Sequence, residues 1–295
     1  MVVALHVQQL SFAYRRTPVL HDITLPALYA GEVTALVGPN GTGKSTLLRA
    51  IAGLHKTDAT VTLGPDRPVP EQNTEQTNTG QATVRVRRRL TRLGLADHIV
   101  YVPQELPAAS SITVFEAVLL TCQQGGAQLR PSQATLDRVA ESLDQLNIAD
   151  LAGSALSELS GGQRQLVSLA QALVRRPTVM LLDEPTSNLD LRNQLKLLEL
   201  IREVATTQPA IVLLTIHDLG LAARFADRIA VLNAGHLHSC GPPEDTITSS
   251  MLREVYRVEA SVHPSPDGTL AVSANRSLPH AQDPEPSAVA QGAGR

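Results

Sequence analysis

The feature that most constrains this chain is the glycine-rich stretch "GPNGTGKST" at residues 38–46, which lies between an apolar run and a segment with helical spacing. It matches the pattern G-x-x-x-x-G-K-[ST] in the strand, loop and helix context that this pattern requires. Its glycines let the backbone turn with N–H groups pointing inward, and the N-terminus of the following helix adds a field that favours phosphate oxygens. We therefore interpret the stretch as a cradle for the phosphates of a nucleotide.

Every residue of the stretch is a candidate for nucleotide binding: Gly38, Pro39, Asn40, Gly41, Thr42, Gly43, Lys44, Ser45 and Thr46. The Lys44 ammonium is predicted to reach the β- and γ-phosphates, and the Ser45 hydroxyl is predicted to ligate Mg²⁺. A phosphate loop of this kind also occurs in kinases, GTPases and motors. The class of protein therefore has to come from the other motifs.

The segment "TVMLLDE" at 178–184 is a continuous apolar run that ends in two acidic residues. A second such run, "AIVLLTIHD" at 210–218, follows a segment with helical spacing, which predicts parallel strands buried on both faces. Carboxylates at the end of a buried strand are unfavourable unless they face a cation or a ligand. Asp183 is predicted to hold the Mg²⁺ shell, and Glu184 to orient and deprotonate the attacking water. Two solvated carboxylates at a strand end are the alternative.

The segment "LSGGQRQLVSLAQAL" at 159–173 predicts a second phosphate-binding surface. Ser160, Gly161 and Gly162 open a helix without a bulky side chain near its N-terminus, where the helix dipole favours anions. One chain with two such surfaces but one phosphate loop poses a geometric problem. The problem is resolved if two copies meet head to tail, so that each covers the nucleotide of the other.

Together these motifs resemble those of the ATP-binding cassette ATPases. "GPNGTGKST" resembles the Walker A motif of that family, "VMLLDE" its Walker B motif and "LSGGQ" its signature motif, over residues 3 to 260 or so. The resemblance implies an α/β fold: a RecA-like P-loop NTPase core with an N-terminal antiparallel β subdomain and an inserted α-helical subdomain at about residues 106–165. It also implies ATP and Mg²⁺ as cofactors and ATP hydrolysis as the reaction.

Further residues take their roles from their positions in the resemblance. Tyr14 resembles the aromatic residue that stacks on adenine, with packing in the core as the alternative. Gln104 in "YVPQ" resembles the Q-loop glutamine, which touches Mg²⁺ or water and moves with the partner subunit; an ordinary turn glutamine is the alternative. Asp190 in "SNLD" resembles the D-loop at the dimer seam, and His217 in "TIHD" resembles the histidine that contacts the γ-phosphate.

The resemblance thus implies a catalytic set made of Lys44, Gln104, Glu184 and His217. The implied metal ligands are Ser45, Gln104 and Asp183. Beyond the phosphate loop, the residues implied to contact nucleotide are Tyr14, Ser160, Gly161, Gly162, Gln163 and Asp190.

Composition and periodicity organise the rest of the chain. With 295 residues, 43% of them hydrophobic, the chain can bury a sizeable core. Residues 3–37 predict short strands broken by Pro18, Pro26 and Gly31. Two other stretches, 112–152 and 163–175, predict helices, the first with a break at "QQGGAQLRPS".

Three segments depart from the pattern of a packed core. Residues 64–82 are almost free of large apolar side chains and predict a mobile insertion. Residues 85–98 carry five arginines, interpreted as a solvated helix face, with a contact to lipid headgroups or a membrane subunit as the alternative. Residues 261–295 are rich in Pro, Ser and Gly and predict a disordered tail, so the cassette itself is expected to span residues 1–260.

The net charge, the cysteine positions and the lengths of the apolar runs disfavour several classes of protein. A formal net charge of -3 disfavours a generic nucleic-acid binder. Cys122 and Cys240 lie far apart without metal-ligand spacing, which indicates ordinary thiols in a reducing compartment. The N-terminus "MVVALHVQQL" lacks a basic leader, and the longest apolar runs are shorter than the roughly 20 residues that span a bilayer.

The resemblance also implies what the cassette drives. A single cassette without fused membrane spans is similar to importer subunits, which work as a head-to-tail homodimer at the cytoplasmic face of the membrane. The resemblance implies that such a pair binds separate permease subunits and, through them, a substrate-binding protein. It implies no nucleic-acid partner. The tract from "SELSGGQ" to "LIREVA" and the segment "AGHLHSCGPPEDTITSSMLREVYRVEASV" resemble the ATPases of iron-siderophore, haem and cobalamin importers.

Other functions stay open at this level. A zinc or manganese importer ATPase would share the same motifs. A non-transport ATPase acting on ribosomes or DNA would usually carry two cassettes or a long coiled-coil insertion, and heptads of that length are absent from the sequence. A nucleotide-binding module without turnover is disfavoured by Glu184 and His217.

Overall fold

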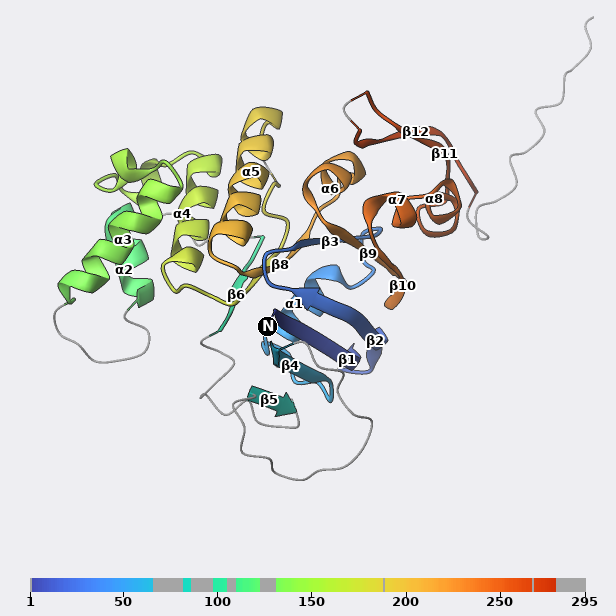
Figure 1. Ribbon diagram of the computed structural model, residues 1–295, viewed down its shortest axis with the longest axis horizontal. Coiled ribbons are helices and arrows are strands. Elements are labelled where there is room, and N and C mark those ends of the chain that lie inside the picture. The colour runs from blue at the N-terminus through green and yellow to red at the C-terminus, as the bar shows by residue number, and fades with distance from the viewer. Residues whose placement is uncertain are drawn as a thin grey trace, which may run out of the picture.

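The computed structural model describes residues 2–65, 82–85, 98–104, 110–122, 131–187, 189–266 and 268–279, with only the backbone described for 82–85. Its centre is a six-stranded sheet in the order β10-β9-β3-β8-β7-β6 (Figure 1). The strands are β10 (His236–Gly241), β9 (Arg228–Asn233), β3 (Val33–Val37), β8 (Ile211–Thr215), β7 (Val179–Leu182) and β6 (Ile99–Val102). All neighbours run parallel except β10 and β9, which pair antiparallel.

A second, antiparallel sheet has the order β2-β1-β4-β5. It consists of β1 (Val3–Tyr14), β2 (Thr17–Tyr29), β4 (Thr60–Pro65) and β5 (Ala82–Arg85). Together with helix α1 (Lys44–Ile51), it packs its apolar side chains on one face of the central sheet. The first two predicted strands form as β1 and β2 of this antiparallel layer, whereas the third forms β3 of the central sheet. The expected breaks at Pro18 and Pro26 were wrong, because both residues lie within β2.

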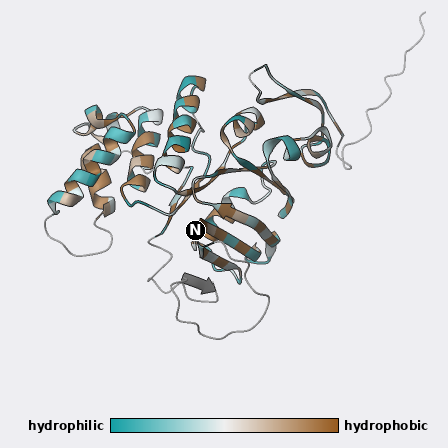
Figure 2. Ribbon diagram, in the orientation of Figure 1, coloured by the Kyte–Doolittle hydropathy of each residue, from teal (hydrophilic) through white to brown (hydrophobic). Residues whose placement is uncertain are grey.

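Helices cover the other face of the central sheet (Figure 1). Their bounds are α4 (Gly161–Leu173), α5 (Leu191–Thr207), α6 (Leu219–Phe225), α7 (Pro243–Thr246) and α8 (Ser249–Val255). Figure 2 shows that the longer helices are hydrophobic along one side and hydrophilic along the other, as expected for helices with one buried face. The N-termini of α4, α5, α6 and α8 are each capped by a side-chain oxygen, from Ser160, Asp190, Asp218 and Thr248.

Alternate residues of the central strands enter two different cores, because successive side chains of a strand point to opposite faces. Val179 and Leu181 of β7 pack with α1 and the antiparallel sheet, whereas Met180 and Leu182 pack with the helices. Strands β3, β7 and β8 are buried at every position. This confirms the prediction of parallel strands buried on both faces.

A separate group of helices extends from one end of the sheet (Figure 1). It contains α2 (Val114–Cys122), α3 (Gln133–Gln145) and the short 3₁₀ turns Ala149–Leu151 and Leu156–Glu158. Both α2 and α3 contact α4, which also contacts β6 of the central sheet. The expected helical segment at about 106–165 therefore contains α2 and α3, and α4 connects this group to the sheet; residues 105–109 and 123–130 lie outside the described part.

The C-terminal segment corrects the sequence-based boundary at residue 260. Strands β11 (Val258–Pro264) and β12 (Leu270–Ser277) form an antiparallel hairpin where a disordered tail was expected. Strand β11 contacts α8 and β12 contacts α6, and apolar residues of both strands pack against the main core. The hairpin forms because apolar residues alternate along both strands and pack on the core: Val258, Ala260 and Val262 in β11, and Leu270 and Val272 in β12. The Pro- and Ser-rich composition of the segment obscured this pattern in the sequence.

Three sequence-based expectations fall mainly outside the described residues. They concern the insertion at 64–82, of which 66–81 are not described, the arginine-rich stretch 85–98, of which 86–97 are not described, and the last part of the tail, 280–295. Among the helices that are described, none combines the length and the apolar character needed to cross a bilayer.

Candidate functional site

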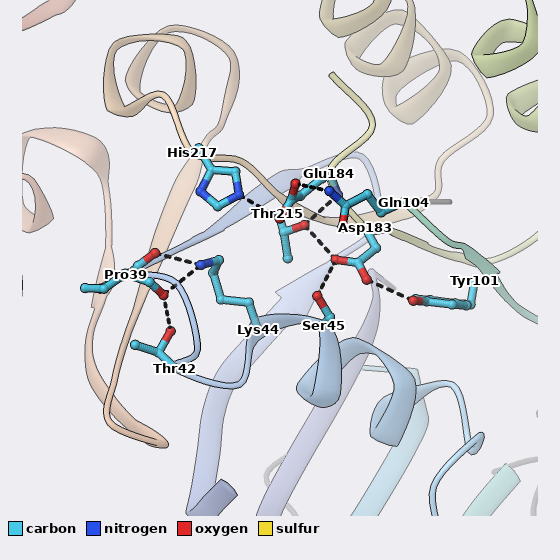
Figure 3. A network of polar contacts seen from close by, with 11 residues as sticks. Pro39, Thr42, Lys44, Ser45, Tyr101, Gln104, Asp183, Glu184, Thr215 and His217 are labelled. Carbon is cyan, nitrogen blue, oxygen red and sulfur yellow. Dashed lines mark hydrogen bonds and ion pairs between the residues drawn. The ribbon is translucent and has the colours of Figure 1, made fainter. Parts of the chain in front are cut away.

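The predicted phosphate loop, the acidic pair, Gln104 and His217 gather at the edge of the sheet where the parallel strands end. The glycine-rich loop follows β3, Asp183 and Glu184 follow β7, His217 comes two residues after β8, and Gln104 comes two residues after β6. Because β3, β8, β7 and β6 are consecutive neighbours and run parallel, their carboxyl ends bring these side chains together (Figure 3).

The loop encloses the Lys44 side chain, which is 6% exposed. Its Nζ donates hydrogen bonds to the backbone oxygens of Gly38 at 2.7 Å and Pro39 at 2.9 Å. Thr42 Oγ1 donates to the same Pro39 oxygen at 2.9 Å. Burial lowers the pKa of the Lys44 ammonium, while Glu184 and Asp183 act against that shift. A phosphate would offer this cation stronger acceptors than the two carbonyls.

Gly38 has the backbone geometry that this loop requires. Its φ is +147°, and a Cβ atom added to it would overlap the carbonyl oxygen of Leu232 in β9. The loop can therefore pass this close to the neighbouring strand only with glycine at position 38.

Asp183 is 1% exposed and accepts hydrogen bonds on both carboxylate oxygens. Oδ1 accepts from Ser45 Oγ at 2.9 Å and from Thr215 Oγ1 at 3.0 Å. Oδ2 accepts from the Tyr101 hydroxyl at 2.9 Å. These donors compensate the burial of a charge that would otherwise be strongly unfavourable.

Tyr101 is in turn held by Arg49, whose Nε donates to the phenol oxygen at 2.9 Å. Burial raises the pKa of Tyr101 to about 12, although the hydrogen bond from Arg49 acts in the opposite direction. The hydroxyl is therefore protonated at neutral pH and able to donate to Asp183.

Glu184 has both carboxylate oxygens occupied by neighbours that were predicted to act with it. Oε2 accepts from Gln104 Nε2 at 2.6 Å, and Oε1 lies 2.6 Å from His217 Nε2. Its backbone N–H donates to Thr215 Oγ1 at 2.6 Å, and its φ is +47°, a left-handed value that is uncommon for a residue with a side chain. Such backbone geometry persists only where the surroundings enforce it.

Lys44, Glu184, Gln104 and His217 border a cavity of about 420 Å³. Its lining consists of Val19, Asn40, Gly41, Gly43, Lys44, Ser45, Thr46, Gln104, Glu184 and His217. The volume lies in the range of small-molecule sites, about 300–1,000 Å³. The structure therefore brings the predicted loop, acidic and histidine residues to one place.

The oxygen donors at this place fit Mg²⁺, which prefers hard oxygen ligands beside phosphates. Ser45 Oγ and Asp183 Oδ1 lie 2.9 Å apart, and the Gln104 amide is at the same cavity. Because Gln104 donates its amide N–H to Glu184, its amide oxygen is the atom that could ligate a cation.

Three residues of this network were not predicted from the sequence: Thr215, Tyr101 and Arg49. Thr215 and Tyr101 lie within the quoted motifs "TIHD" and "YVPQ", at the ends of the strands on either side of β7. Arg49 is four residues after Ser45 and so lies on the same face of α1. The motif positions were a usable signal, but only the strand order shows that both strands flank Asp183.

Tyr14 lies elsewhere in this structure. Its ring packs edge-on against Phe12 and His55, and its hydroxyl lies 3.0 Å from His55 Nε2. Among the described residues, the lining of the 420 Å³ cavity includes Val19 but not Tyr14. Stacking of Tyr14 on adenine stays a prediction.

The signature segment also lies apart from this cavity. Ser160 Oγ accepts from Gln163 N at 3.3 Å, and Gln163 Oε1 accepts from Ser160 N at 2.9 Å, which is a reciprocal capping box at the start of α4. Ser160, Gly162 and Gln163 line a different cavity, of about 600 Å³, between α4 and α5. Gly161 is the first residue of α4. Of the described residues, none lines both cavities.

Asp190 caps helix α5 and is likewise outside the 420 Å³ cavity as far as the described residues go. Its Oδ1 accepts from Asn193 N at 2.8 Å, and its Oδ2 accepts from Asn193 Nδ2 at 3.1 Å. The predicted contact of Asp190 across a dimer seam stays a prediction.

Comparison with known proteins agrees with this geometry. The family described as "ABC transporter" matches residues 20–187. The hemin import ATP-binding protein HmuV of Streptomyces coelicolor is 37% identical over 88% of this chain and 86% of its own length. The chain belongs to the ABC transporter family. The resemblance found in the sequence and the predicted P-loop NTPase fold are thus confirmed, and nucleotide binding follows from the family.

Two further comparisons extend along nearly the whole cassette. The petrobactin import ATP-binding protein FpuD of Bacillus anthracis is 30% identical over 90% of this chain and 91% of its own length. The fold is similar to that of an ABC transporter described as metal-chelate type, solved in an inward-facing conformation, with a TM-score of 0.73 and 25% identity over 93% of this chain and 98% of the other.

Proposed function

We propose that this cassette binds ATP with Mg²⁺ in the 420 Å³ cavity, hydrolyses it in a head-to-tail pair of identical cassettes, and thereby energises the import of a metal chelate. The observation that carries the proposal is the convergence of Lys44, Glu184, Gln104 and His217 on that one cavity. They come from four separate strand ends or loops.

Binding begins with the glycine-rich loop. The loop N–H groups and the N-terminus of α1 favour the phosphate chain, and Lys44 exchanges its bonds to the Gly38 and Pro39 carbonyls for bonds to phosphate oxygens. Ser45, Asp183 and Gln104 are the residues that would hold Mg²⁺, which when bound neutralises charge on the phosphates.

Hydrolysis then depends on Glu184. A water oxygen attacks the γ-phosphorus, the bond from that phosphorus to the bridging oxygen of ADP breaks, and the water gives a proton to the Glu184 carboxylate. The Glu184 side chain is 16% exposed, so it is largely shielded while still able to reach a water in the cavity. Its contacts with Gln104 and His217 orient the carboxylate.

The head-to-tail pair is supported by the separate position of the signature segment. Ser160, Gly162 and Gln163 do not share the cavity with Lys44. A signature that contacts phosphate would therefore act on the nucleotide of a second copy.

The cargo and location rest on the relatives. Hemin and petrobactin are named as the imports of two of them, and a metal-chelate type transporter has a similar fold. We infer an iron-siderophore, haem or cobalamin-type cargo, passed by a substrate-binding protein to separate permease subunits, with the cassette attached to those subunits at the cytoplasmic face of the membrane.

The test replaces Lys44 by alanine and uses Lys56→Ala, at an exposed position outside the cavity, as the matched control. Loss of one charge-stabilising donor lowers turnover by about 10²–10³-fold. Phosphate release from Mg-ATP and chelate uptake by cells that carry each variant are both expected to fall with Lys44→Ala and to persist with Lys56→Ala. Equal phosphate release by the two variants would refute the proposed site. If Lys44→Ala loses phosphate release but cells that carry it take up the chelate normally, the proposed cargo is refuted.

A further inference from the structure

The two oxygens of the Asp183 carboxylate have different surroundings (Figure 3). Oδ1 lies on the side of Ser45 and Thr215, at 2.9 and 3.0 Å from their hydroxyl oxygens. Oδ2 lies on the opposite side and contacts the Tyr101 hydroxyl at 2.9 Å. Rotation of the carboxylate by half a turn would exchange these surroundings. The hydrogen bonds of the two oxygens therefore decide which oxygen faces Ser45.

The chemistry of the donors fixes the direction of the contact with Tyr101. The guanidinium of Arg49 has only donors, so in its 2.9 Å contact with the phenol the phenol oxygen must accept. The phenol has one proton of its own, and the carboxylate can only accept. The chain of bonds therefore runs one way, from Arg49 Nε to the Tyr101 hydroxyl and from there to Asp183 Oδ2.

The fold delivers this chain from two independent elements. In β6, Val102 pairs with Leu182 of β7, and the backbone N–H of Asp183 donates to the Val102 oxygen at 2.9 Å, so Tyr101 is fixed beside Asp183 by sheet register. Arg49 comes from α1, one turn after Ser45. Helix α1 thus reaches Asp183 twice, directly through Ser45 and indirectly through Arg49 and Tyr101.

We propose that Tyr101 and Arg49 are positioning residues that hold Asp183 Oδ2, so that Oδ1 stays on the Ser45 side where Mg²⁺ would bind. The proposal rests on the proposed function, because it assigns a purpose to the geometry around a cation site. Partners that orient a ligand in this way typically change metal affinity by about 10–100-fold when they are removed.

A purely structural role predicts a different result. If the chain only compensates the burial of Asp183, loss of the Tyr101 hydroxyl lowers stability but leaves the metal dependence of nucleotide binding unchanged. If it orients the carboxylate, the same loss weakens the metal-dependent part of binding. The two roles are therefore separated by the midpoint of a Mg²⁺ titration.

The experiment compares Tyr101→Phe with Tyr29→Phe, a matched tyrosine at the end of β2 outside the cavity. Binding of a fluorescent ADP analogue to the full chain is measured first in EDTA and then during a MgCl₂ titration, so that no turnover is needed. For Tyr101→Phe we expect the Mg²⁺ midpoint to rise about tenfold, while the affinity for the ADP analogue in EDTA stays within about twofold of that of the wild type. Tyr29→Phe is expected to match the wild type in both.

A second variant tests the order of the chain and does not depend on Tyr101→Phe being stable. Arg49→Met removes the donor to the phenol and should raise the Mg²⁺ midpoint by a smaller factor. Because Arg49 acts through Tyr101, the double variant should be no worse than Tyr101→Phe alone.

Several outcomes would overturn the proposal. They are a Mg²⁺ midpoint in Tyr101→Phe equal to that of the wild type, or, where that variant does not fold, an unchanged midpoint in Arg49→Met. Fully additive effects in the double variant would refute the linear chain. If the wild type itself binds no nucleotide in EDTA or with Mg²⁺, the proposed function fails, a result distinct from an unchanged Tyr101→Phe.

Discussion

The cluster at the strand ends and the signature segment at the start of α4 both carry side chains expected at phosphates, but the chain completes them to different degrees. At the strand ends, the loop after β3, the acids after β7, Gln104 and His217 converge on one cavity. The signature residues bond to one another and line a different cavity. Within the described part of the chain, the residues predicted for hydrolysis therefore share one cavity, whereas the predicted second phosphate-binding surface lies at another cavity that contains none of them.

The two regions also differ in how their polar groups are satisfied. Asp183 and Glu184 are held by groups from other elements far along the chain, such as Thr215 and Gln104. Ser160 and Gln163 are satisfied locally, within one helical turn. A locally satisfied helix N-terminus can be presented to a second molecule as a unit, whereas the strand-end cluster depends on the whole sheet.

The largest effect on hydrolysis is expected from Glu184→Gln. The amide cannot take the proton of the attacking water, so hydrolysis should fall by about 10²–10⁴-fold while nucleotide still binds. Phosphate release measures the loss, and light scattering after gel filtration in Mg-ATP should detect a dimer held by unhydrolysed nucleotide. Glu141→Gln, which removes an exposed partner of Arg176, is the control. A variant that stays monomeric under saturating Mg-ATP would refute the head-to-tail pair, because the signature would then have no second chain to act on.

A smaller effect is expected when the loop backbone is disturbed. In Gly38→Ala the new methyl group would overlap the Leu232 carbonyl oxygen, so the loop must shift, at a cost of about 3 kcal/mol from overlap and left-handed backbone together. Gly41→Ala has a positive φ as well but open space around its Cβ, and should lose about 1 kcal/mol. Urea unfolding measures the difference, and equal losses would show that β9 does not constrain the loop.

Two helix N-caps should contribute similarly to stability but differently to ATP turnover. Ser160→Ala and Ser132→Ala each remove a helix N-cap in which the hydroxyl accepts from the N–H three residues on, and each should lose about 1 kcal/mol of unfolding free energy. Only Ser160→Ala should also lower ATP turnover, because only Ser160 would contact the nucleotide of a partner. Parallel urea unfolding and phosphate-release assays separate the two effects, and unchanged turnover in Ser160→Ala would leave Ser160 a cap and no more.

The sequence predicts those site residues that stand together in one continuous motif. The glycine-rich loop and the two acids after β7 were found in this way, whereas Gln104 and His217 were predicted from the resemblance to the ATP-binding cassette ATPases; the structure brings all of them together. Thr215 and Tyr101 were not found, because a hydroxyl at a strand end has no significance until the neighbouring strand is known. Only the order β8-β7-β6 puts both of them beside Asp183.

The hairpin β11–β12 shows the same limit in the fold. Its pattern of alternating apolar residues is short and interrupted, and the composition alone suggested a disordered tail. Contacts with α6 and α8 supply the apolar surface on which the hairpin packs. An isolated two-stranded hairpin would be only marginally stable in water, so its formation depends on that surface.

By itself the sequence determined that this chain carries a phosphate loop, a pair of strand-end acids and a signature helix, because each needs only neighbouring residues and the local preferences of strand, turn and helix. The tertiary structure alone decided that Asp183 is oriented by Tyr101 and Arg49, that Glu184 lies between Gln104 and His217, and that the signature faces another cavity. Those relations depend on strand order and on packing between residues distant in the chain, where the burial of both faces of the sheet, and not any local preference, selects one arrangement.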